Sequence, residues 1–441
     1  MLKFPRIFFV RQNFPHRRLQ DVAGEVARQL AAASFGSRLS PGARVALGVG
    51  SRGITNIATI VRSVVDYWKA QGMRPFIFPA MGSHGAATAE GQALILARYG
   101  INEQTMDCPV ISQLEVVSLG KTEDGIEAFM DRVAYESSGV MLINRVKWHT
   151  NFSGAIESGL FKMMAIGIGK FAGAERYHTY AYRLGMVNMI RSVGRQVLKT
   201  GKILGGLAIL EDAYHDTAKL DAVPVEGMEQ REEENLALVK SWMAKIPLDL
   251  DILIIDEIGK EIAGSGMDLK VINRWSGPGE EPIPGAHNFE RIFVRNLSPL
   301  SHHNAAGVGR ADVVTDRLVN QVDWNATYIN VLTSSMTLGA RMPIHFPTDR
   351  ECLERMMPTV GKFDMGDVTI GWIRNTLELA VLGLSENLKS EIGNDPTLEI
   401  LGPACDLKFD RDGNLVRPQF GDIGNKNVPG SEEESLPNTG R

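Results

Sequence analysis

Side chains that could act on a substrate or hold a cofactor gather in three short segments of the first half of the chain. His84 lies in Met81-Gly82-Ser83-His84-Gly85, and His149 ends the run Asn144-Arg145-Val146-Lys147-Trp148-His149. Lys162 and His178 follow, sixteen residues apart. Imidazole can transfer protons near neutral pH or bind a metal, although a single loop histidine is more often an ordinary surface residue. The grouping therefore makes these four residues candidates for chemistry.

Lys162 stands in an unusually apolar run, Leu160-Phe161-Lys162-Met163-Met164. A lysine in such surroundings can lose its charge and become a nucleophile or a covalent attachment point. The simpler interpretation, a lysine whose stem is buried and whose amine reaches water, stays open. Glycines at positions 159, 167, 169 and 173 oppose a regular helix here. They indicate a backbone shaped around something that it approaches closely.

The segment Gly48-Val49-Gly50-Ser51-Arg52-Gly53 fits the pattern G-x-G-x-x-G. Such glycines let backbone N–H groups contact a phosphate, which makes Ser51 and Gly53 candidate cofactor contacts. Arg52 could bind a carboxylate through two hydrogen bonds. A NAD site also needs an acid about 20 residues further on, and no acid occurs between Asp66 and Glu90. A plain glycine-rich turn remains the alternative.

Cysteine and histidine spacing excludes the common protein-only metal sites. Cys108, Cys352 and Cys405 form no C-x-x-C, which argues against a disulfide framework or a zinc ribbon. Neither H-E-x-x-H nor a His/Cys cluster occurs. A bound metal would therefore take part of its coordination from a cofactor.

The elements that must position these residues alternate between strands and helices. We predict strands at 44–50, 75–80, 140–146, 203–210, 251–256, 291–296, 327–332 and 368–370. We predict helices at 57–68, 93–99 with Thr88 as N-cap, 229–243, 311–322 and 349–357. This alternation indicates an α/β fold: two α/β domains with mainly parallel sheets and an active-site cleft between them. The histidine segments each follow a predicted strand, at the edge where open parallel sheets bind ligands.

We place the domain boundary near Pro247. Residues 1–247 form an N-terminal domain that carries the candidate residues, and residues 248–410 form a second domain that completes the cleft. Residues 411–441 form a tail expected to lack ordered structure, since its end has few aliphatic residues. Ser276–Gly285, with three glycines and three prolines, is a loop.

Composition limits the class of protein. The 441 residues include 47 Lys+Arg and 52 Asp+Glu, a formal charge of −5, and 44% are hydrophobic. No basic block is present for a nucleic acid or an anionic membrane, and no apolar stretch is long enough to span a bilayer. No signal-peptide core is found either, so we expect a cytoplasmic location.

The ordered set Ser51-Arg52, Gly82-Ser83-His84, His149 with Phe152-Ser153-Gly154 and Lys162, and then His178 resembles the nickel-pincer lactate racemase family. The resemblance covers the first domain and enters the second at Ser265-Gly266-Met267-Asp268. Within that family, the sequence resembles the broader α-hydroxyacid racemase and epimerase branch.

The resemblance implies a nickel ion held in a nickel-pincer nucleotide, pyridinium-3,5-bisthiocarboxylic acid mononucleotide, which is covalently linked to Lys162. His178 would be the nickel ligand, His84 and His149 the two acid/base residues, and Arg52 the residue that holds the substrate carboxylate. The implied activity is inversion of the α-carbon of a 2-hydroxycarboxylic acid by reversible hydride transfer. Its partners would be that small-molecule substrate and the cofactor maturation proteins, and an oligomer is compatible with it.

Two departures from the lactate enzymes bear on the substrate. Three extra residues fall within Ala155–Leu160, and after Asp268 the substrate contacts are replaced around Ile272, Asn273 and Arg274. Asn273 and Arg274 are thus candidate substrate contacts, for an acid longer or more polar than lactate. Two other functions stay open: a NAD-dependent 2-hydroxyacid dehydrogenase and a non-catalytic hydroxyacid-binding protein.

Overall fold

The computed structural model describes residues 3–50, 53–150, 152–274, 286–334, 336–393 and 395–417, which fall into two compact units. The N-terminal unit contains described residues of 16–149 and 153–243. The C-terminal unit contains residues 3–15, the described residues from 244 to 417, and residues 150 and 152. Ser51, Arg52 and the predicted loop Ser276–Gly285 lie outside the described residues.

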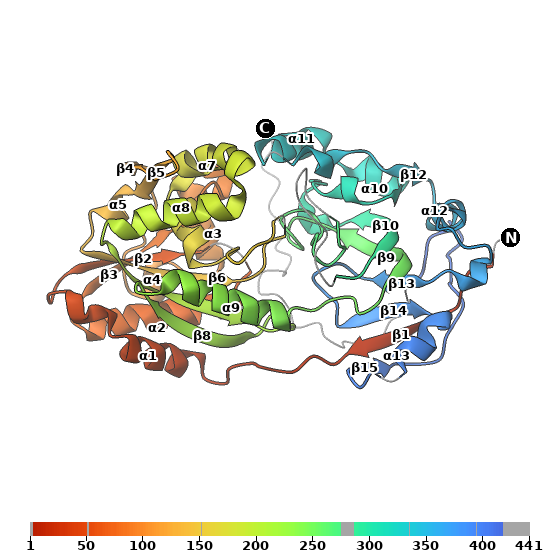
Figure 1. The fold of residues 1–441 in the computed structure, drawn as a ribbon, viewed down its shortest axis with the longest axis horizontal. Coiled ribbons are helices and arrows are strands. Elements are labelled where there is room, and N and C mark those ends of the chain that lie inside the picture. The colour runs from red at the N-terminus through yellow and green to blue at the C-terminus, as the bar shows by residue number, and fades with distance from the viewer. Residues whose placement is uncertain are drawn as a thin grey trace. The chain divides into compact units, whose positions relative to one another are not determined.

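The N-terminal unit is built on a five-stranded sheet in the order β3-β2-β6-β7-β8, with a separate β4-β5 ribbon (Figure 1). The strands are β2 (Arg44–Val49), β3 (Arg74–Pro79), β4 (Val116–Lys121), β5 (Glu127–Asp131), β6 (Gly139–Val146), β7 (Ile203–Glu211) and β8 (Thr217–Pro224). The helices are α1 (Val22–Ala33), α2 (Ile57–Ala70), α3 (Ala89–Arg98), α4 (Glu103–Met106), α5 (Arg132–Tyr135), α6 (Leu160–Lys162), α7 (Lys170–Leu184), α8 (Met186–Lys199) and α9 (Met228–Trp242). The strands β3, β2, β6 and β7 are parallel, and β8 pairs antiparallel with β7 at the edge.

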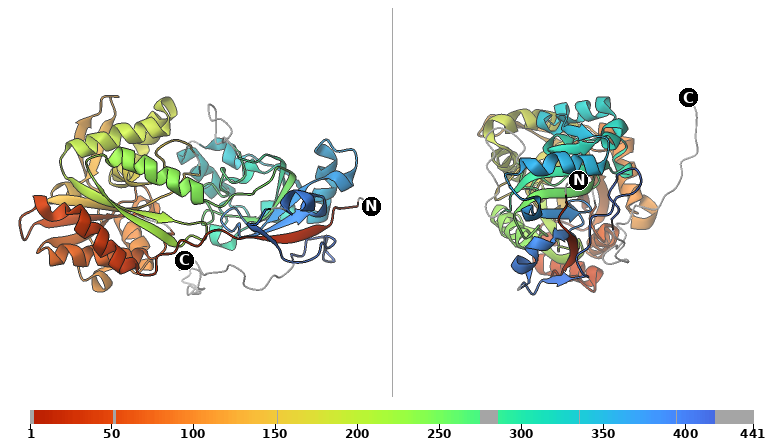
Figure 2. Two further views of the ribbon diagram at one scale, coloured as in Figure 1. Left: turned by 60° about the horizontal axis from the view of Figure 1, so that its bottom comes forward. Right: turned by 90° about the vertical axis from the view of Figure 1, so that its right-hand side faces the viewer.

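Helices cover both faces of this sheet, because its strands are apolar on both sides. Alternate residues such as Val45, Leu47 and Val49 pack into one core with Val26 and Leu30 of α1. The helices α1 and α2 lie on that face, and α8 and α9 lie on the other (Figure 2). The helices on the second face, α8 and α9, both come after β6 in the chain.

The strand order reverses at β2. After β3 has been added on one side of β2, the chain returns to add β6 on the other side. In open α/β sheets a ligand crevice forms at the carboxyl ends of the strands where the order reverses. The loops that follow β3, β2 and β6 all start at this edge.

The C-terminal unit is built on an eight-stranded mixed sheet in the order β12-β11-β10-β9-β13-β14-β1-β15. The strands are β1 (Ile7–Gln12), β9 (Leu250–Ile258), β10 (Phe289–Leu297), β11 (Val313–Thr315), β12 (Ile344–Phe346), β13 (Ile370–Ile373), β14 (Val381–Ser385) and β15 (Leu398–Ile400). The helices are α10 (Asp316–Gln321), α11 (Trp324–Thr333), α12 (Asp349–Met356) and α13 (Lys389–Ile392). The five strands from β12 to β13 are parallel, while β14, β1 and β15 add antiparallel pairs.

The structure thus consists of two α/β domains with mainly parallel sheets, as predicted, but the N-terminus differs from the predicted boundaries. Strand β1 pairs with β14 and β15, so residues 3–15 belong to the C-terminal unit and not to a domain of residues 1–247. Its apolar run, Ile7–Val10, is fully buried in that sheet. Sequence periodicity does not reveal a strand pairing across more than 350 residues.

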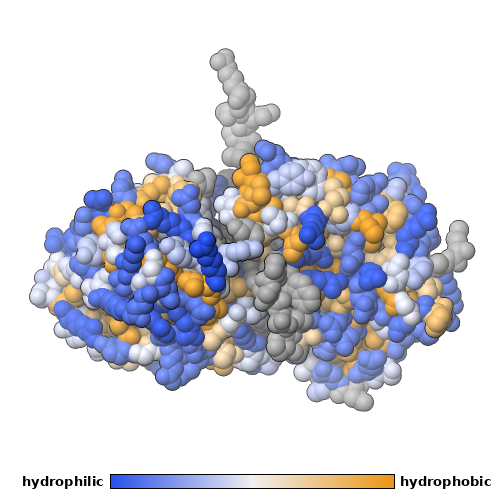
Figure 3. Space-filling view, turned by 45° about the horizontal axis from the view of Figure 1, so that its top comes forward, coloured by the Kyte–Doolittle hydropathy of each residue, from blue (hydrophilic) through white to orange (hydrophobic). Residues whose placement is uncertain are grey.

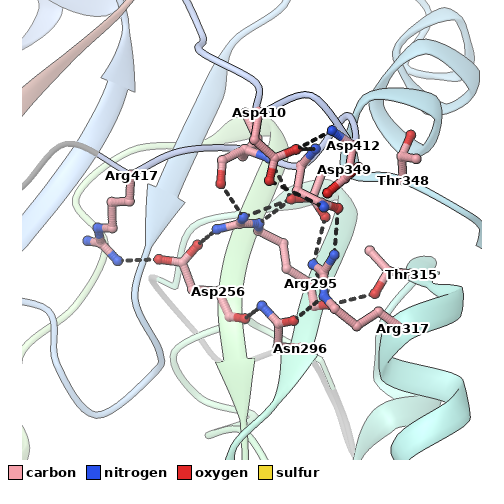
Figure 4. A network of polar contacts seen from close by, with 12 residues as sticks. Asp256, Arg295, Asn296, Thr315, Arg317, Thr348, Asp349, Asp410, Asp412 and Arg417 are labelled. Atoms are coloured by element: carbon pink, nitrogen blue, oxygen red, sulfur yellow. Dashed lines mark hydrogen bonds and ion pairs between the residues drawn. The ribbon is translucent and has the colours of Figure 1, made fainter.

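The first residues of the predicted tail are also ordered. Residues 411–417 pack on the C-terminal sheet through a polar network centred on Arg295, which contacts Asp256 and Asp349 (Figure 4). Arg417 contacts Asp256, and the Leu415 backbone N–H donates to Asp349 at 2.8 Å. The buried Arg295, with carboxylate partners on both sides, also donates to the Leu415 carbonyl at 2.6 Å and so helps to fix this segment. The rest of the tail, from residue 418, lies outside the described residues.

Most of the predicted elements are confirmed to within a few residues, including the Thr88 N-cap. The predicted strand 327–332 is wrong, because these residues form α11, whose N-cap Asp323 accepts from the Ala326 N–H. The predicted helix 311–322 divides into β11 and α10.

Hydrophilic and hydrophobic residues are interspersed over the face shown in Figure 3. Among the described residues, no helix has the length and apolar character needed to cross a membrane.

Candidate active site

Three loops of the N-terminal unit begin at the carboxyl ends of neighbouring parallel strands. His84 follows β3, the Gly48–Gly53 turn follows β2, and His149 follows β6. Neighbouring strands are about 4.8 Å apart, so the two histidine loops start roughly 10 Å apart with the glycine turn between them. That separation leaves room for a small molecule between two side chains.

The His84 loop packs against the segment that follows Lys162. The Gly82 N–H donates to the Gly167 carbonyl at 3.1 Å, and Gly82 has a φ of +60°. A Cβ at Gly82 would lie 2.9 Å from Ile166, and one at Gly167 would lie 2.6 Å from the Ala80 carbonyl oxygen. Glycine is required at both positions because the two backbones are in contact. This contact joins the His84 loop to the Lys162 segment.

A buried polar network holds the same loop from behind. The amide of Gln92, fully buried on α3, donates to the Gly82 carbonyl at 2.8 Å. Lys170, also fully buried, donates to the Pro79 carbonyl at 2.6 Å and to Gln92 Oε1 at 3.2 Å, and lies 3.2 Å from Asp131. Burial lowers the pKa of Lys170 and raises the pKa of Asp131. The ion pair opposes both shifts, so the two groups stabilise each other's charge.

The glycine turn after β2 is held by side chains of β6 and β7. Arg145 donates to the Gly53 carbonyl and to Glu211, both at 2.6 Å. Glu211 also accepts from the Thr55 N–H at 2.9 Å. Among the described residues, no atom lies within 4 Å of a Cβ added at Gly53. Ser51 and Arg52, the predicted contacts in the turn, lie outside the described residues.

The loop that starts at His149 closes on the carboxylate of Glu157. Glu157 is fully buried and accepts hydrogen bonds from the backbone N–H groups of His149 and, at 3.1 Å, of Gly154. Its charge is paired with Lys240 of α9 at 2.6 Å. Lys147 and Ser158 pair across the neck of the loop. The backbone of His149 is therefore fixed on both sides.

Lys162 is partly buried and ends the short helix α6, directly before a π-helical segment, Met163–Gly167. The carboxylate of Glu232, on α9, accepts from the Leu160 N–H at 2.7 Å and from the Phe161 N–H at 3.0 Å. Burial raises the pKa of Glu232 to about 8, although these two hydrogen bonds act in the opposite direction. The turn before Lys162 is thus capped by a side chain from a distant helix.

His178 lies within α7, which begins eight residues after Lys162. The structure describes its position in the helix but not its side chain. Its role as a metal ligand therefore stays a prediction. Among the side chains that are described, no group of three or more His, Cys, Asp and Glu residues could hold a metal ion.

The two candidate substrate contacts of the C-terminal unit bind within their own unit. Asn273 donates to Asn288 at 3.0 Å, and Arg274 lies 3.2 Å from Asp312. Both partners directly precede strands, β10 and β11. The resemblance motif upstream, Ser265–Asp268, follows β9, and the Asp268 N–H donates to Thr376 at 2.8 Å. A role in substrate binding stays a prediction for both residues.

A cavity of about 380 Å³ is present elsewhere in the N-terminal unit. Arg44, Arg74 and Cys108 are among its lining residues, so it lies at the amino ends of β2 and β3. It is at the opposite edge of the sheet from the histidine loops. Burial raises the pKa of the Cys108 thiol to about 11, which makes this cysteine unreactive.

Sequence analysis missed the residues that hold these loops in place. Glu157, Glu232, Lys240, Gln92 and Lys170 looked like ordinary polar residues of a surface. One signal was present: Glu232 stands four residues after Met228 and four before Leu236, on what proves to be the buried side of α9. An acid in that stripe needs a buried partner.

Comparisons with protein-family models and with curated proteins find no match. Among solved structures, the chain is similar to a protein from Thermotoga maritima, with a TM-score of 0.50 and 13% identity over 81% of this chain and 97% of that chain. It also aligns with the lactate racemase apoprotein from Thermoanaerobacterium thermosaccharolyticum, with a TM-score of 0.45 and 11% identity over 89% and 96% of the two chains. The first similarity concerns the fold alone, and the second is too loose to support a conclusion about this chain.

Proposed function

We propose that this protein is a nickel-dependent racemase or epimerase that inverts the α-carbon of a 2-hydroxycarboxylic acid. The observation that supports the proposal is the order of the loops on one sheet edge. The two histidines of the sequence resemblance follow the strands on either side of β2, and the Lys162 segment packs against the His84 loop. These residues come from separate parts of the sequence, and the fold brings their loops to neighbouring positions.

The chain has features that fit a tethered nucleotide cofactor. Lys162 is a partly buried lysine on a capped turn, and no described atom lies within 4 Å of a Cβ added at Gly53, which fits a ligand beside that turn. Lys162 would be the point of attachment and His178 the protein ligand of the nickel ion. When bound, the nickel-pincer nucleotide would supply the acceptor for the α-hydrogen of the substrate.

The two histidines would handle the proton of the substrate hydroxyl. Loss of the α-hydrogen as hydride has to be accompanied by loss of the hydroxyl proton, because together they convert the substrate to a 2-keto acid, which regains both on inversion. His84 or His149 would accept this proton at an imidazole nitrogen and later return it. Inversion requires a base for each enantiomer, and the separation of the two loops fits bases on opposite sides of one substrate. Arg52 would hold the carboxylate in both orientations.

Intact-protein mass spectrometry and nickel analysis test this proposal. We expect protein produced with the cofactor maturation proteins to carry nickel and a nucleotide-derived adduct on Lys162, and to reduce the optical purity of a 2-hydroxyacid. Lys162→Arg should lack the adduct. His84→Asn and His149→Asn should keep it and lose activity by about 10²–10⁴-fold, the usual contribution of a positioned acid or base.

An unmodified Lys162 without nickel under these conditions would refute the proposal. If the wild-type protein bound a hydroxyacid without turnover, and the His84→Asn variant bound it with unchanged affinity, the non-catalytic alternative would hold. The NAD alternative receives no support from the fold. The strand after the glycine turn, β3, ends at Pro79, and Pro79 and the following Ala80 are buried and offer no acid for the ribose.

A further inference from the structure

Helix α9 carries polar residues on its buried side. Its buried residues are Met228, Glu232, Asn235, Leu236 and Val239, which recur at helical spacing. Two of the five are polar, and each has a specific partner. Asn235 donates to Asp221 of β8 at 2.7 Å, and Glu232 accepts from the turn before Lys162.

Where Glu232 contacts the turn before Lys162, there is no room for a side chain at position 159. A Cβ at Gly159 would lie only 2.5 Å from Glu232 Oε1, so glycine is the residue that lets the carboxyl group reach the Leu160 and Phe161 N–H groups. No side chain at position 159 could cap α6 locally. The cap has to come from another element, and α9 supplies it.

The second contact lies two turns further along the same helix. Lys240 pairs with the buried Glu157 at 2.6 Å and donates to the Gly154 carbonyl at 2.8 Å. Glu157 in turn accepts from the His149 N–H. Since an α-helix rises 1.5 Å per residue, Glu232 and Lys240 are roughly 12 Å apart along its axis.

The helix itself is fixed to the sheet. It packs on β6, β7 and β8, and Arg231 and Asn235 both bind Asp221. A rigid rod with two contacts about 12 Å apart determines the distance between the two segments that it holds. Glu232 contacts main-chain groups directly before Lys162, and Lys240 acts on the His149 N–H through the carboxylate of Glu157.

We propose that α9 is the positioning element of the candidate site: Glu232 sets the Lys162 turn, and Lys240 acting through Glu157 sets the backbone of His149. These three are positioning residues, and the inference rests on the proposed function for its catalytic consequence. The contacts hold the cofactor attachment point and one acid/base residue at a fixed distance from each other. The His84 loop is held separately, by Gln92 and Lys170.

Buried polar and charged groups at these positions cost free energy if stability is their only purpose. Burying a carboxyl group needs compensation by hydrogen bonds or a paired charge, whereas a leucine or methionine would pack at these positions without that cost. Burial is complete for Glu157 and almost complete for Glu232. Their geometry gives what an apolar side chain cannot give, a directed bond to a particular backbone N–H.

The test compares Lys240→Met, Glu232→Leu and the control Glu234→Gln, which changes an exposed acid of the same helix. Hydrogen–deuterium exchange of the full chain without cofactor reports the positioning directly. We expect Lys240→Met to accelerate exchange at His149 and Gly154 by about tenfold or more, and Glu232→Leu to do so at Leu160 and Phe161. Lys240→Arg should restore protection, since it keeps the charge.

The same variants, loaded with cofactor, separate positioning from general stability. We expect Lys240→Met to lower kcat by about 10²-fold at nearly unchanged KM, because a displacement of about 1 Å in a reacting group has that effect. Glu234→Gln should change neither quantity. If Glu232→Leu does not fold, Lys240→Met and its Arg counterpart still decide the question.

Two results would overturn the inference. One is faster exchange spread equally over β6, β7 and the His149 loop, which is the pattern of lost global stability. The other is an active holoenzyme in which Lys240→Met leaves kcat unchanged. If the wild-type protein shows neither adduct nor turnover, the proposed function fails, while the local exchange pattern still confirms or refutes the positioning.

Discussion

Glu232 should make the stability of this protein depend on pH in an unusual direction. Burial raises its pKa from 4.5 to about 8 in the folded protein, whereas in the unfolded chain the group returns to its ordinary value. Between these two values the folded state binds a proton that the unfolded state does not. The free energy of unfolding therefore falls as pH rises, by about 1.4 kcal/mol per pH unit.

Integrated over the whole pH interval, the contribution of Glu232 to the free energy of unfolding changes by about 5 kcal/mol. This stabilisation is fully present below about pH 4.5 and is lost above about pH 8. Most carboxyl groups do the opposite, since their pKa falls on folding. Other titrating groups will overlay this effect, so the quantity to measure is a difference between two proteins. Glu232→Gln has the shape of the protonated acid and cannot ionise.

We expect the stability of the wild type relative to Glu232→Gln to decrease by about 2 kcal/mol between about pH 6 and about pH 8, since the slope falls as the pH approaches the folded pKa. Urea denaturation followed by circular dichroism at several pH values gives this difference, and Glu234→Gln serves as the exposed control. A difference that does not change with pH would refute the argument. A difference that increases with pH would mean that the two backbone hydrogen bonds outweigh burial and that Glu232 is ionised in the folded protein.

Two further substitutions test the contacts around the site. Gly159→Ala should destabilise the protein by about 1–3 kcal/mol in urea denaturation, because the new Cβ would lie 2.5 Å from Glu232 Oε1. In the control Gly36→Ala the new Cβ would lie 3.7 Å from its nearest neighbour, so the effect should be small. Equal effects of the two substitutions would show that Glu232 moves aside freely. Lys170→Met should cost about 3–5 kcal/mol by leaving Asp131 buried without its partner. Adding Asp131→Asn should recover part of that loss, and no recovery would mean that the cost comes from packing alone.

The sequence predicted those helices, caps and strands that depend on the local order of residues. The periodic apolar stripe of α2, the Thr88 cap and the buried strands β2, β6 and β7 were all found close to their predicted bounds. The histidine loops were correctly assigned to the ends of strands, because that follows from the order of elements alone. Local propensity failed at residues 327–332, where a run that included Ile and Val was predicted as a strand and an Asp cap starts a helix.

The support behind the candidate residues was out of reach for a different reason. Glu232 binds the backbone at residues 160 and 161, more than seventy residues earlier, and Lys240 binds Gly154. No local signal links such positions, since their meeting depends on how β6 and α9 pack. A charged helix could be predicted at 229–243, and the spacing of Glu232 from Met228 and Leu236 indicated a buried acid, but the partner of that acid could not be predicted.

Strand β1 has a consequence for synthesis of the chain on the ribosome. Its partners β14 and β15 begin at residues 381 and 398, so Ile7–Val10 cannot pair with them until more than 370 further residues have been made. At roughly 5–20 residues per second, the intervening residues take about 20–70 s to translate. During that time the apolar residues of β1 lack the strands that cover them, and the C-terminal sheet cannot form completely before β14 and β15 have been made.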